Sequence, residues 1–142
     1  MMGCVFCEIV SGTLPAGFVL EDAATVAFMD RRQPNAELGG HVLVVPRRHV
    51  ESVYELDPET GARLMEAIVR IANAVRCSFG PAGLSIWQSN GVAAGQEVPH
   101  VHFHVLARAP GDGLLRVYPE KPPYPDAGAR ERLAGKIRAA LD

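Results

Sequence analysis

Hydrophobic positions gather in five short segments of the chain, either alternating with polar residues or in brief apolar runs. Each segment is bounded by Gly, Pro or Asp, which is typical of β-strands. The predicted strands are residues 17–20, 25–29, 41–45, 83–89 and 100–107. The gaps between the first three are short, which favours antiparallel neighbours because parallel strands need a longer crossover.

A longer segment between the third and fourth predicted strands has the periodicity of a helix. Asp57 is the expected N-cap, Pro58 takes the first helical position, and Gly80-Pro81 ends the helix. The spacing predicts one buried face, made of Leu64, Met65, Ile68, Ile71, Ala72, Val75 and Phe79. We expect Cys77, on the same helix, to be a small buried residue without a chemical role.

The order of these elements predicts a single α+β domain over residues 1–142. We expect a mostly antiparallel five-stranded sheet with one main helix on one face and further helices at the termini. A Pro-rich stretch follows the last strand, and residues 127–141 have the composition of a closing helix. Residues 119–142 are therefore predicted to form a C-terminal arm and helix.

Composition and charge narrow the class of protein. The chain is 48% hydrophobic and 21% charged, as in an ordinary globular protein, and its net charge of −2 provides no broad basic surface. We therefore expect no nucleic-acid partner. The apolar run at residues 42–45 is far shorter than the roughly 20 residues of a membrane span. With no basic-then-apolar N-terminal segment and only three cysteines, we expect a cytoplasmic protein with reduced thiols and no membrane partner.

Three of the five histidines occupy alternate positions, His100, His102 and His104. On a strand, alternate residues face the same side. One interpretation is a polar surface, and a second is a tris-histidine metal site, although same-face neighbours lie about 6.6–7 Å apart and rarely converge on one ion. The third is catalysis, in which a neutral imidazole attacks phosphorus and forms a covalent phosphoramidate. We favour the third, with His104 neutralising phosphate charge or assisting proton transfer.

The pair Cys4 and Cys7 forms a Cys-x-x-Cys motif, which occurs in zinc sites, in redox proteins and by chance. Tetrahedral zinc requires two more ligands. A redox pair usually begins a helix after a βαβ-type strand, and no such strand is predicted before residue 4.

The histidine segment resembles the motif of the histidine triad (HIT) superfamily, His-x-His-x-His followed by apolar residues. The resemblance extends in order along most of the chain, through Cys4-Val-Phe-Cys7-Glu-Ile9, Leu14-Pro-Ala16, Ala27-Phe-Met-Asp30, Gly40-His-Val-Leu-Val-Val-Pro46, His49, Ser89-Asn-Gly91 and Gly95-Gln-Glu-Val-Pro-His100. It implies a HIT-like fold and a nucleotide hydrolase or transferase. The substrates it implies are purine nucleotide phosphoramidates or dinucleoside polyphosphates, attacked at the α-phosphate by His102 through a nucleotidyl-histidine intermediate. The alternative is a catalytically minor, nucleotide-binding dimeric interaction or signalling module.

The resemblance also assigns roles to individual residues. His104 and Gln96 join His102 as the catalytic group, and Asp30 accepts hydrogen bonds from the ribose hydroxyls. The implied nucleotide-binding residues are Phe6, Ile9, Phe28, Asp30, Asn90, Gly95, Gln96, His102 and His104. Without the resemblance, Asp30 and Asn90 would be interpreted as ordinary turn formers. The apolar residues Phe6, Ile9 and Phe28 would be interpreted as core residues.

The resemblance also bears on the metal, the oligomer, His41 and the leaving group. The resemblance implies structural zinc on Cys4, Cys7, His49 and His100, a closed Cys₂His₂ set with no open position. It implies a homodimer, and it places His41 beside the triad, where we expect it to orient the catalytic ring. Glu97 departs from relatives that carry a hydroxyl near the leaving group, because a carboxylate cannot donate in the same way.

Overall fold

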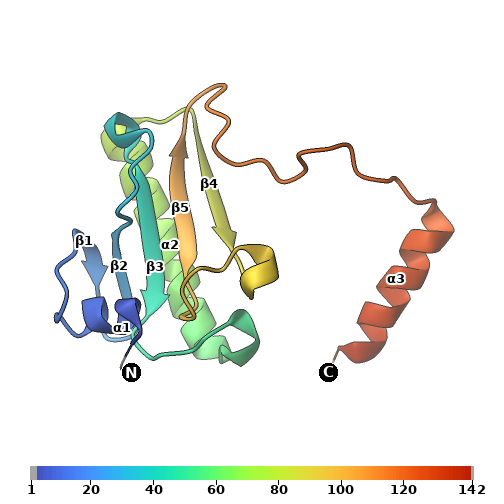
Figure 1. The fold of residues 1–142 in the computed structure, drawn as a ribbon, viewed down its shortest axis with the longest axis horizontal. Helices are drawn as coiled ribbons and strands as arrows, with labels where there is room; N and C mark the ends of the chain where they lie inside the picture. The colour runs from blue at the N-terminus through green and yellow to red at the C-terminus, as the bar shows by residue number, and fades with distance from the viewer. Residues whose placement is uncertain (1–2, 142) are drawn as a thin grey trace. The chain divides into compact units, whose positions relative to one another are not determined.

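The computed structural model describes residues 3–141. Its strands are β1 (Phe18–Glu21), β2 (Thr25–Met29), β3 (His41–Pro46), β4 (Gly83–Gln88) and β5 (Phe103–Arg108). They form one sheet in the order β1-β2-β3-β5-β4, and every neighbouring pair is antiparallel (Figure 1). With helices α1 (Val5–Val10), α2 (Pro58–Phe79) and α3 (Ala127–Ala140), this confirms the predicted α+β class.

The chain divides into two compact units, one ending at Asp112 and the other beginning at Gly113, before the predicted arm at residue 119. The second unit contains α3, whose N-cap Asp126 accepts a hydrogen bond from the Ala129 amide at 2.8 Å. Its bounds agree with the predicted closing helix to within one residue. Across the described residues, no helix combines the length and the apolar character that a membrane crossing requires.

Four predicted strands are confirmed to within a residue at each end, but the fifth begins later than predicted. β5 starts at Phe103, so His100 and His102 precede it. The reason is that the backbone here bonds to loops: the His100 amide donates to the Val98 carbonyl, and the Val101 amide donates to the Val50 carbonyl at 2.7 Å. The prediction that three histidines share one strand face was therefore wrong.

Helix α2 begins and ends as predicted. The Asp57 carboxylate accepts a hydrogen bond from the Thr60 amide at 2.8 Å, and Gly80 terminates the helix with a left-handed φ of 59°. Met65 and Phe79 were wrongly assigned to the buried face, since 53% and 51% of their surface is exposed. Cys77 is also exposed, which contradicts its expected burial. The buried stripe follows a single row of the helix, Leu64, Ala67, Ile68, Ile71 and Val75.

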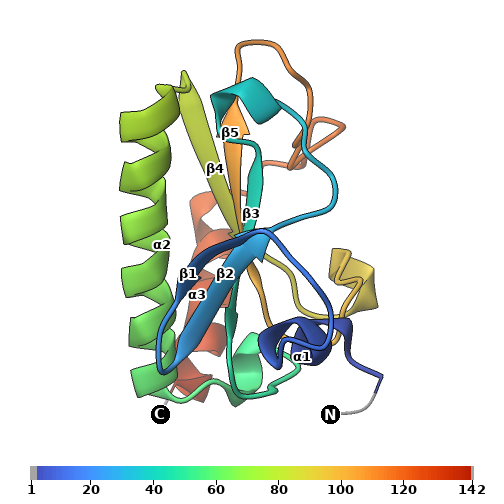
Figure 2. The ribbon, with the colours of Figure 1, turned by 90° about the vertical axis from the view of Figure 1, so that its left-hand side faces the viewer.

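The sheet has a core on each face. Alternate residues of β2 and β3 divide between them: Ala27 and Val44 pack with α2, whereas Phe28 and Val45 pack with α1. Figure 2 shows α2 against one face of the sheet and α1 on the opposite side. Because both faces are covered, β3 is apolar along most of its length, and the residues described next lie on the α1 side.

Candidate active site and metal centre

His102 lies directly before β5 and is only 6% exposed. Its Nδ1 is 2.7 Å from the His100 carbonyl oxygen, and a carbonyl can only accept, so Nδ1 carries the proton and Nε2 keeps its lone pair. The Phe6 ring stands edge-on at 5.0 Å. Burial lowers the pKa of His102 and outweighs the His100 carbonyl and the nearby acidic groups, which raise it. The ring is thus neutral at neutral pH and offers an unprotonated Nε2.

His104 lies on β5 and stacks on Trp87 across the β4–β5 pair, with centroids 4.3 Å apart and ring planes 2° from parallel. Its Nδ1 is 2.9 Å from Nε2 of His41, on β3. Burial, followed by the charges of His102 and His41, lowers the pKa of His104 to about 3. His104 therefore presents a neutral hydrogen-bonding group and no positive charge.

Asp30 follows β2, and its side chain is 9% exposed. Oδ1 accepts hydrogen bonds from the Arg32 backbone amide at 2.7 Å and from Nε at 3.2 Å, while Oδ2 accepts from Nη2 at 3.3 Å. Burial raises the pKa of Asp30, but the hydrogen bonds from Arg32 outweigh it, and the pKa lies below its ordinary value. The ionised carboxylate and the guanidinium both act electrostatically on His102 and His104.

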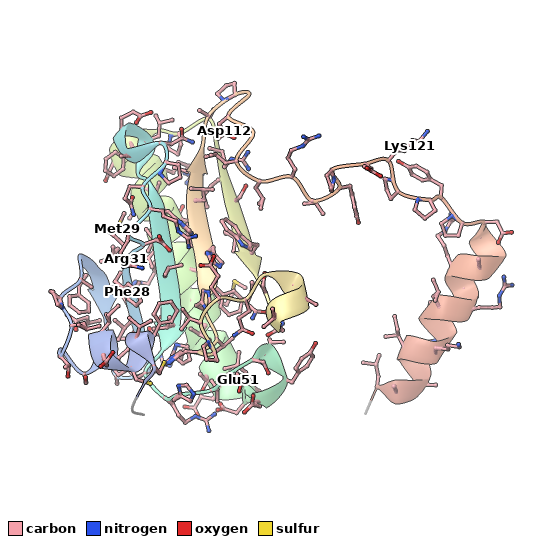
Figure 3. All side chains as sticks on the ribbon, viewed as in Figure 1. Phe28, Met29, Arg31, Glu51, Asp112 and Lys121 are labelled. Carbon is pink, nitrogen blue, oxygen red and sulfur yellow. The ribbon has the colours of Figure 1, made fainter. Side chains whose placement is uncertain are left out.

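The loop between β4 and β5 is braced by two amide side chains. Oε1 of Gln96 accepts from the Gly91 amide at 2.7 Å, and its Nε2 donates to the carbonyls of Val98 and Glu51, the latter labelled in Figure 3. Oδ1 of Asn90 accepts from the Val53 amide at 2.8 Å, while its Nδ2 donates to the Gln88 side chain. The side-chain amides of both predicted ligand residues, Gln96 and Asn90, therefore form hydrogen bonds that hold the loop. Gly95 ends the short 3₁₀ turn Val92–Ala94 with a φ of 86°.

The three apolar residues predicted to line the base pocket belong to the core on the α1 side of the sheet. Phe6 and Phe28, the second labelled in Figure 3, are buried and meet edge to face with centroids 5.4 Å apart. Ile9 is partly buried against the same cluster. Their packing holds α1, and with it Phe6, beside the ring of His102.

A second group converges near the start of α1. One ligand atom from each of Cys4, Cys7, His49 and His100 lies within 4.8 Å of the others. Sγ of Cys7 is 3.3 Å from Nδ1 of His49 and 3.6 Å from Nδ1 of His100, and Sγ of Cys4 is 3.5 Å from Nδ1 of His100. Zinc–sulfur and zinc–nitrogen bonds of about 2.3 and 2.0 Å at a tetrahedral angle place sulfur and nitrogen about 3.5 Å apart. The four side chains fit such an ion.

The ring of His100 is held in the orientation that a metal ligand needs. Its Nε2 donates to the Pro46 carbonyl at 2.9 Å, so Nδ1 is the unprotonated atom and faces the two thiols. The carbonyl of His100 also accepts the hydrogen bond from Nδ1 of His102. One residue therefore belongs to both groups.

Sequence patterns did not identify two of these neighbours. Trp87 lies opposite His104 only through the register of β4 with β5, which the sequence does not specify. Arg32 follows Asp30 in an ordinary turn, and its contact with Glu97 spans 65 positions in sequence. His41 was predicted beside the catalytic ring, and the structure places it against His104.

Comparison with known proteins matches residues 11–111 to the model of the HIT domain family. A relative from Bacillus subtilis, called Protein hit, is 40% identical over 116 residues, which cover 81% of this chain and 78% of that protein. A protein of Schizosaccharomyces pombe named adenosine 5'-monophosphoramidase is 33% identical over 140 residues, covering 96% and 100%. The crystal structure of a HIT family member from Bacillus subtilis superposes with a TM-score of 0.86 at 33% identity, covering 99% of this chain and 98% of the other.

Proposed function

The chain belongs to the HIT domain family, and on that premise we propose that it is a purine-nucleotide hydrolase or transferase in which His102 attacks the α-phosphate. The observation that carries the proposal is the hydrogen bond from Nδ1 of His102 to the His100 carbonyl, which leaves Nε2 unprotonated. The name of the fission-yeast relative supports nucleotide phosphoramidates as one substrate class. Dinucleoside polyphosphates are the other class.

In the proposed step, the Nε2–phosphorus bond forms as the bond from phosphorus to the leaving group breaks. The leaving group takes a proton from solvent, and water or another acceptor then releases the nucleotide from His102. While the adduct exists, the His102 ring carries positive charge, and the His100 carbonyl stabilises it by accepting from Nδ1. This carbonyl is therefore the group whose interaction strengthens as the reaction proceeds.

Three other residues are assigned supporting roles. His104 donates from Nε2 to a phosphate oxygen, and for this His41 must donate its Nε2 proton to Nδ1 of His104. Asp30 accepts from the ribose hydroxyls. Gln96 acts through the loop that it braces, since its amide reaches a phosphate only after giving up a bond to a backbone group.

The test is to incubate the protein with adenosine 5'-phosphoramidate, quench it in alkali and search for adenylated His102 by mass spectrometry. The matched variant is His102→Asn, because an asparagine amide can keep the bond to the His100 carbonyl while Nε2 is lost. We expect the adduct and turnover in wild type and neither in the variant, with at least a 10³-fold loss of kcat. A fully active variant would refute the nucleophile.

The alternative is a nucleotide-binding interaction module with little catalysis. It predicts that AMP binds to wild type and to His102→Asn equally, with neither adduct nor turnover for either protein. A neutral ring with a free Nε2 favours the enzyme, because binding alone requires no unprotonated nitrogen beside the phosphate.

We further propose that Cys4, Cys7, His49 and His100 hold a structural zinc ion. The donor set and the spacing of the ligand atoms support it, and four protein ligands leave no position open for substrate. The bound ion would tie the first turn of α1 to the segments that precede β5 and follow β3. No step of the proposed reaction depends on it.

Metal analysis tests this assignment. We expect about one zinc per chain in wild type and a loss of most of it in Cys7→Ser. Cys77→Ser is the matched control, since it removes an exposed thiol outside the cluster. Zinc-free wild type, or unchanged zinc in Cys7→Ser, would contradict the proposal.

We also propose a homodimer that covers the outer side of α2 and the edge strand β4. Met65 and Val69 on α2 and Ile86 on β4 are exposed apolar residues. Within residues 3–141, β4 pairs with β5 alone and forms an edge of the sheet. Light scattering should give twice the chain mass for wild type and a smaller mass for Val69→Glu. A monomeric wild type at micromolar concentration would contradict it.

A further inference from the structure

The geometry points to Arg32 as a specificity-determining residue that competes with the ribose diol for Asp30 and turns to Glu97 when a nucleotide binds. The inference rests on the proposed function, because it takes Asp30 as the ribose-binding carboxylate. It adds a residue outside the predicted site and gives a role to Glu97, for which the predicted resemblance offers none.

The Asp30 carboxylate can accept only a limited number of hydrogen bonds. Two oxygens offer about four acceptor positions, and donors from Arg32 take three of them, two on Oδ1 and one on Oδ2. Nδ1 of His41 lies 3.9 Å from Oδ2 on the buried side. The carboxylate is only 9% exposed, so solvent reaches little of it. Two ribose hydroxyls need acceptor positions that the Arg32 side chain now fills.

Glu97 is the alternative partner of the Arg32 side chain. Nη2 lies 3.3 Å from Oε2 of Glu97, and Nη1 lies 3.5 Å from Oε1. The side chains of Arg32 and Glu97 are 63% and 69% exposed, so both can rotate. When the guanidinium leaves Asp30, it loses one of its two carboxylate partners but keeps the other, Glu97. The bond from the Arg32 backbone amide to Asp30 survives the change.

Competition between Arg32 and the ribose diol should have a small, measurable effect on affinity. The side-chain contact between Arg32 and Asp30 joins an exposed guanidinium to a largely buried carboxylate. Because solvent screens the guanidinium, we expect the pair to change an equilibrium by about two- to fivefold. Arg32 should therefore reduce the affinity for nucleotides that carry the ribose diol by this factor. A nucleotide without the hydroxyls leaves Arg32 in place and is unaffected. Arg32 thereby reduces the margin by which the site prefers ribonucleotides.

Calorimetric titration with AMP and with 2',3'-dideoxy-AMP tests the inference. Arg32→Met removes the guanidinium and keeps an apolar stem, and Arg31→Met, at the residue labelled in Figure 3, removes the same charge one position away. We expect Arg32→Met to bind AMP about two- to fivefold more tightly and dideoxy-AMP unchanged, with Arg31→Met like wild type. Glu97→Gln should weaken AMP binding by a similar factor, because the contacts of 3.3 and 3.5 Å shorten only once the guanidinium leaves Asp30, and it should have no effect when Arg32→Met is already present.

The outcomes separate the two proposals. If wild type prefers AMP to dideoxy-AMP and Arg32→Met leaves that ratio unchanged, the competition is refuted while the ribose role of Asp30 stands. If Arg32→Met weakens both nucleotides equally, Arg32 is a phosphate ligand and the inference is wrong. If wild type does not distinguish the two nucleotides, Asp30 does not bind ribose and both ideas fail.

Discussion

Replacing His104 with asparagine should make the protein less sensitive to acid. His104 is held neutral in the folded state, with its pKa lowered from an ordinary 6.5 to about 3 by burial and by its histidine neighbours. The unfolded chain takes up this proton near pH 6.5, and the folded chain does not. Stability from this group is therefore complete above pH 6.5 and falls as the pH drops from 6.5 towards 3.

The size of the effect follows from linkage. Each pH unit below 6.5 costs about 1.4 kcal/mol for one such proton, so moving from pH 7.5 to 5.0 costs at most about 2 kcal/mol. Water around the partly exposed ring screens the interaction and reduces this to about 1–2 kcal/mol. Asparagine places its amide near the position of Nδ1 and can keep the bond to His41, while the stack on Trp87 is lost. At pH 7.5 the variant should be about 0.5–1.5 kcal/mol less stable than wild type.

Urea unfolding at pH 7.5 and 5.0 measures both quantities. Trp87 is the only tryptophan in the chain and provides the fluorescence signal, with far-ultraviolet circular dichroism as a second probe. Wild type should lose about 1–2 kcal/mol more than His104→Asn over this interval. Val105→Ala, a cavity variant on the same strand without a titrating group, should keep the slope of wild type. Parallel pH dependences for wild type and His104→Asn would refute the buried neutral imidazole.

Three other predictions concern the core, the helix cap and the metal centre. Ile68→Ala should cost about 2–5 kcal/mol in urea unfolding, whereas Arg63→Ala on the exposed side of the same helix should cost at most about 0.5 kcal/mol, and equal costs would place the buried face wrongly. Asp57→Ala should lower the urea midpoint through loss of the cap on α2, and restoration by Ser at this position is the check. A chelator should lower the melting temperature of wild type and leave that of Cys4→Ser unchanged.

The elements with local signals were predictable from the sequence. Local residues specify both ends of helix α2, because Asp57 caps the first turn and Gly80 adopts a left-handed backbone conformation. Strand β2 was placed at the observed bounds, since its apolar run is closed by Asp30. The buried row of α2 was less accurate, because a row one position away has almost the same spacing, and only the sheet beneath decides which of Leu64 and Met65 is covered.

Features that depend on long-range contacts were not predictable. The start of β5 is decided by Val50, whose carbonyl accepts the Val101 amide before the strand pairing begins. The pairing of Trp87 with His104 depends on register. The alternation of the three histidines suggested a shared strand face, yet His100 and His102 lie in an irregular segment that turns their rings towards different partners.

The irregular backbone around His100 has a consequence for the chemistry of His102. On a regular strand, the carbonyl of His100 would be taken by the neighbouring strand and would not be available to His102. Because the segment leaves the ladder, the carbonyl turns to Nδ1 of His102 and sets its tautomer, while the ring of His100 faces Cys4 and Cys7. Whatever fixes the His100 ring therefore also fixes the carbonyl that keeps Nε2 of His102 unprotonated. A structural metal ion there would act on the nucleophile through one residue's backbone, without touching the substrate.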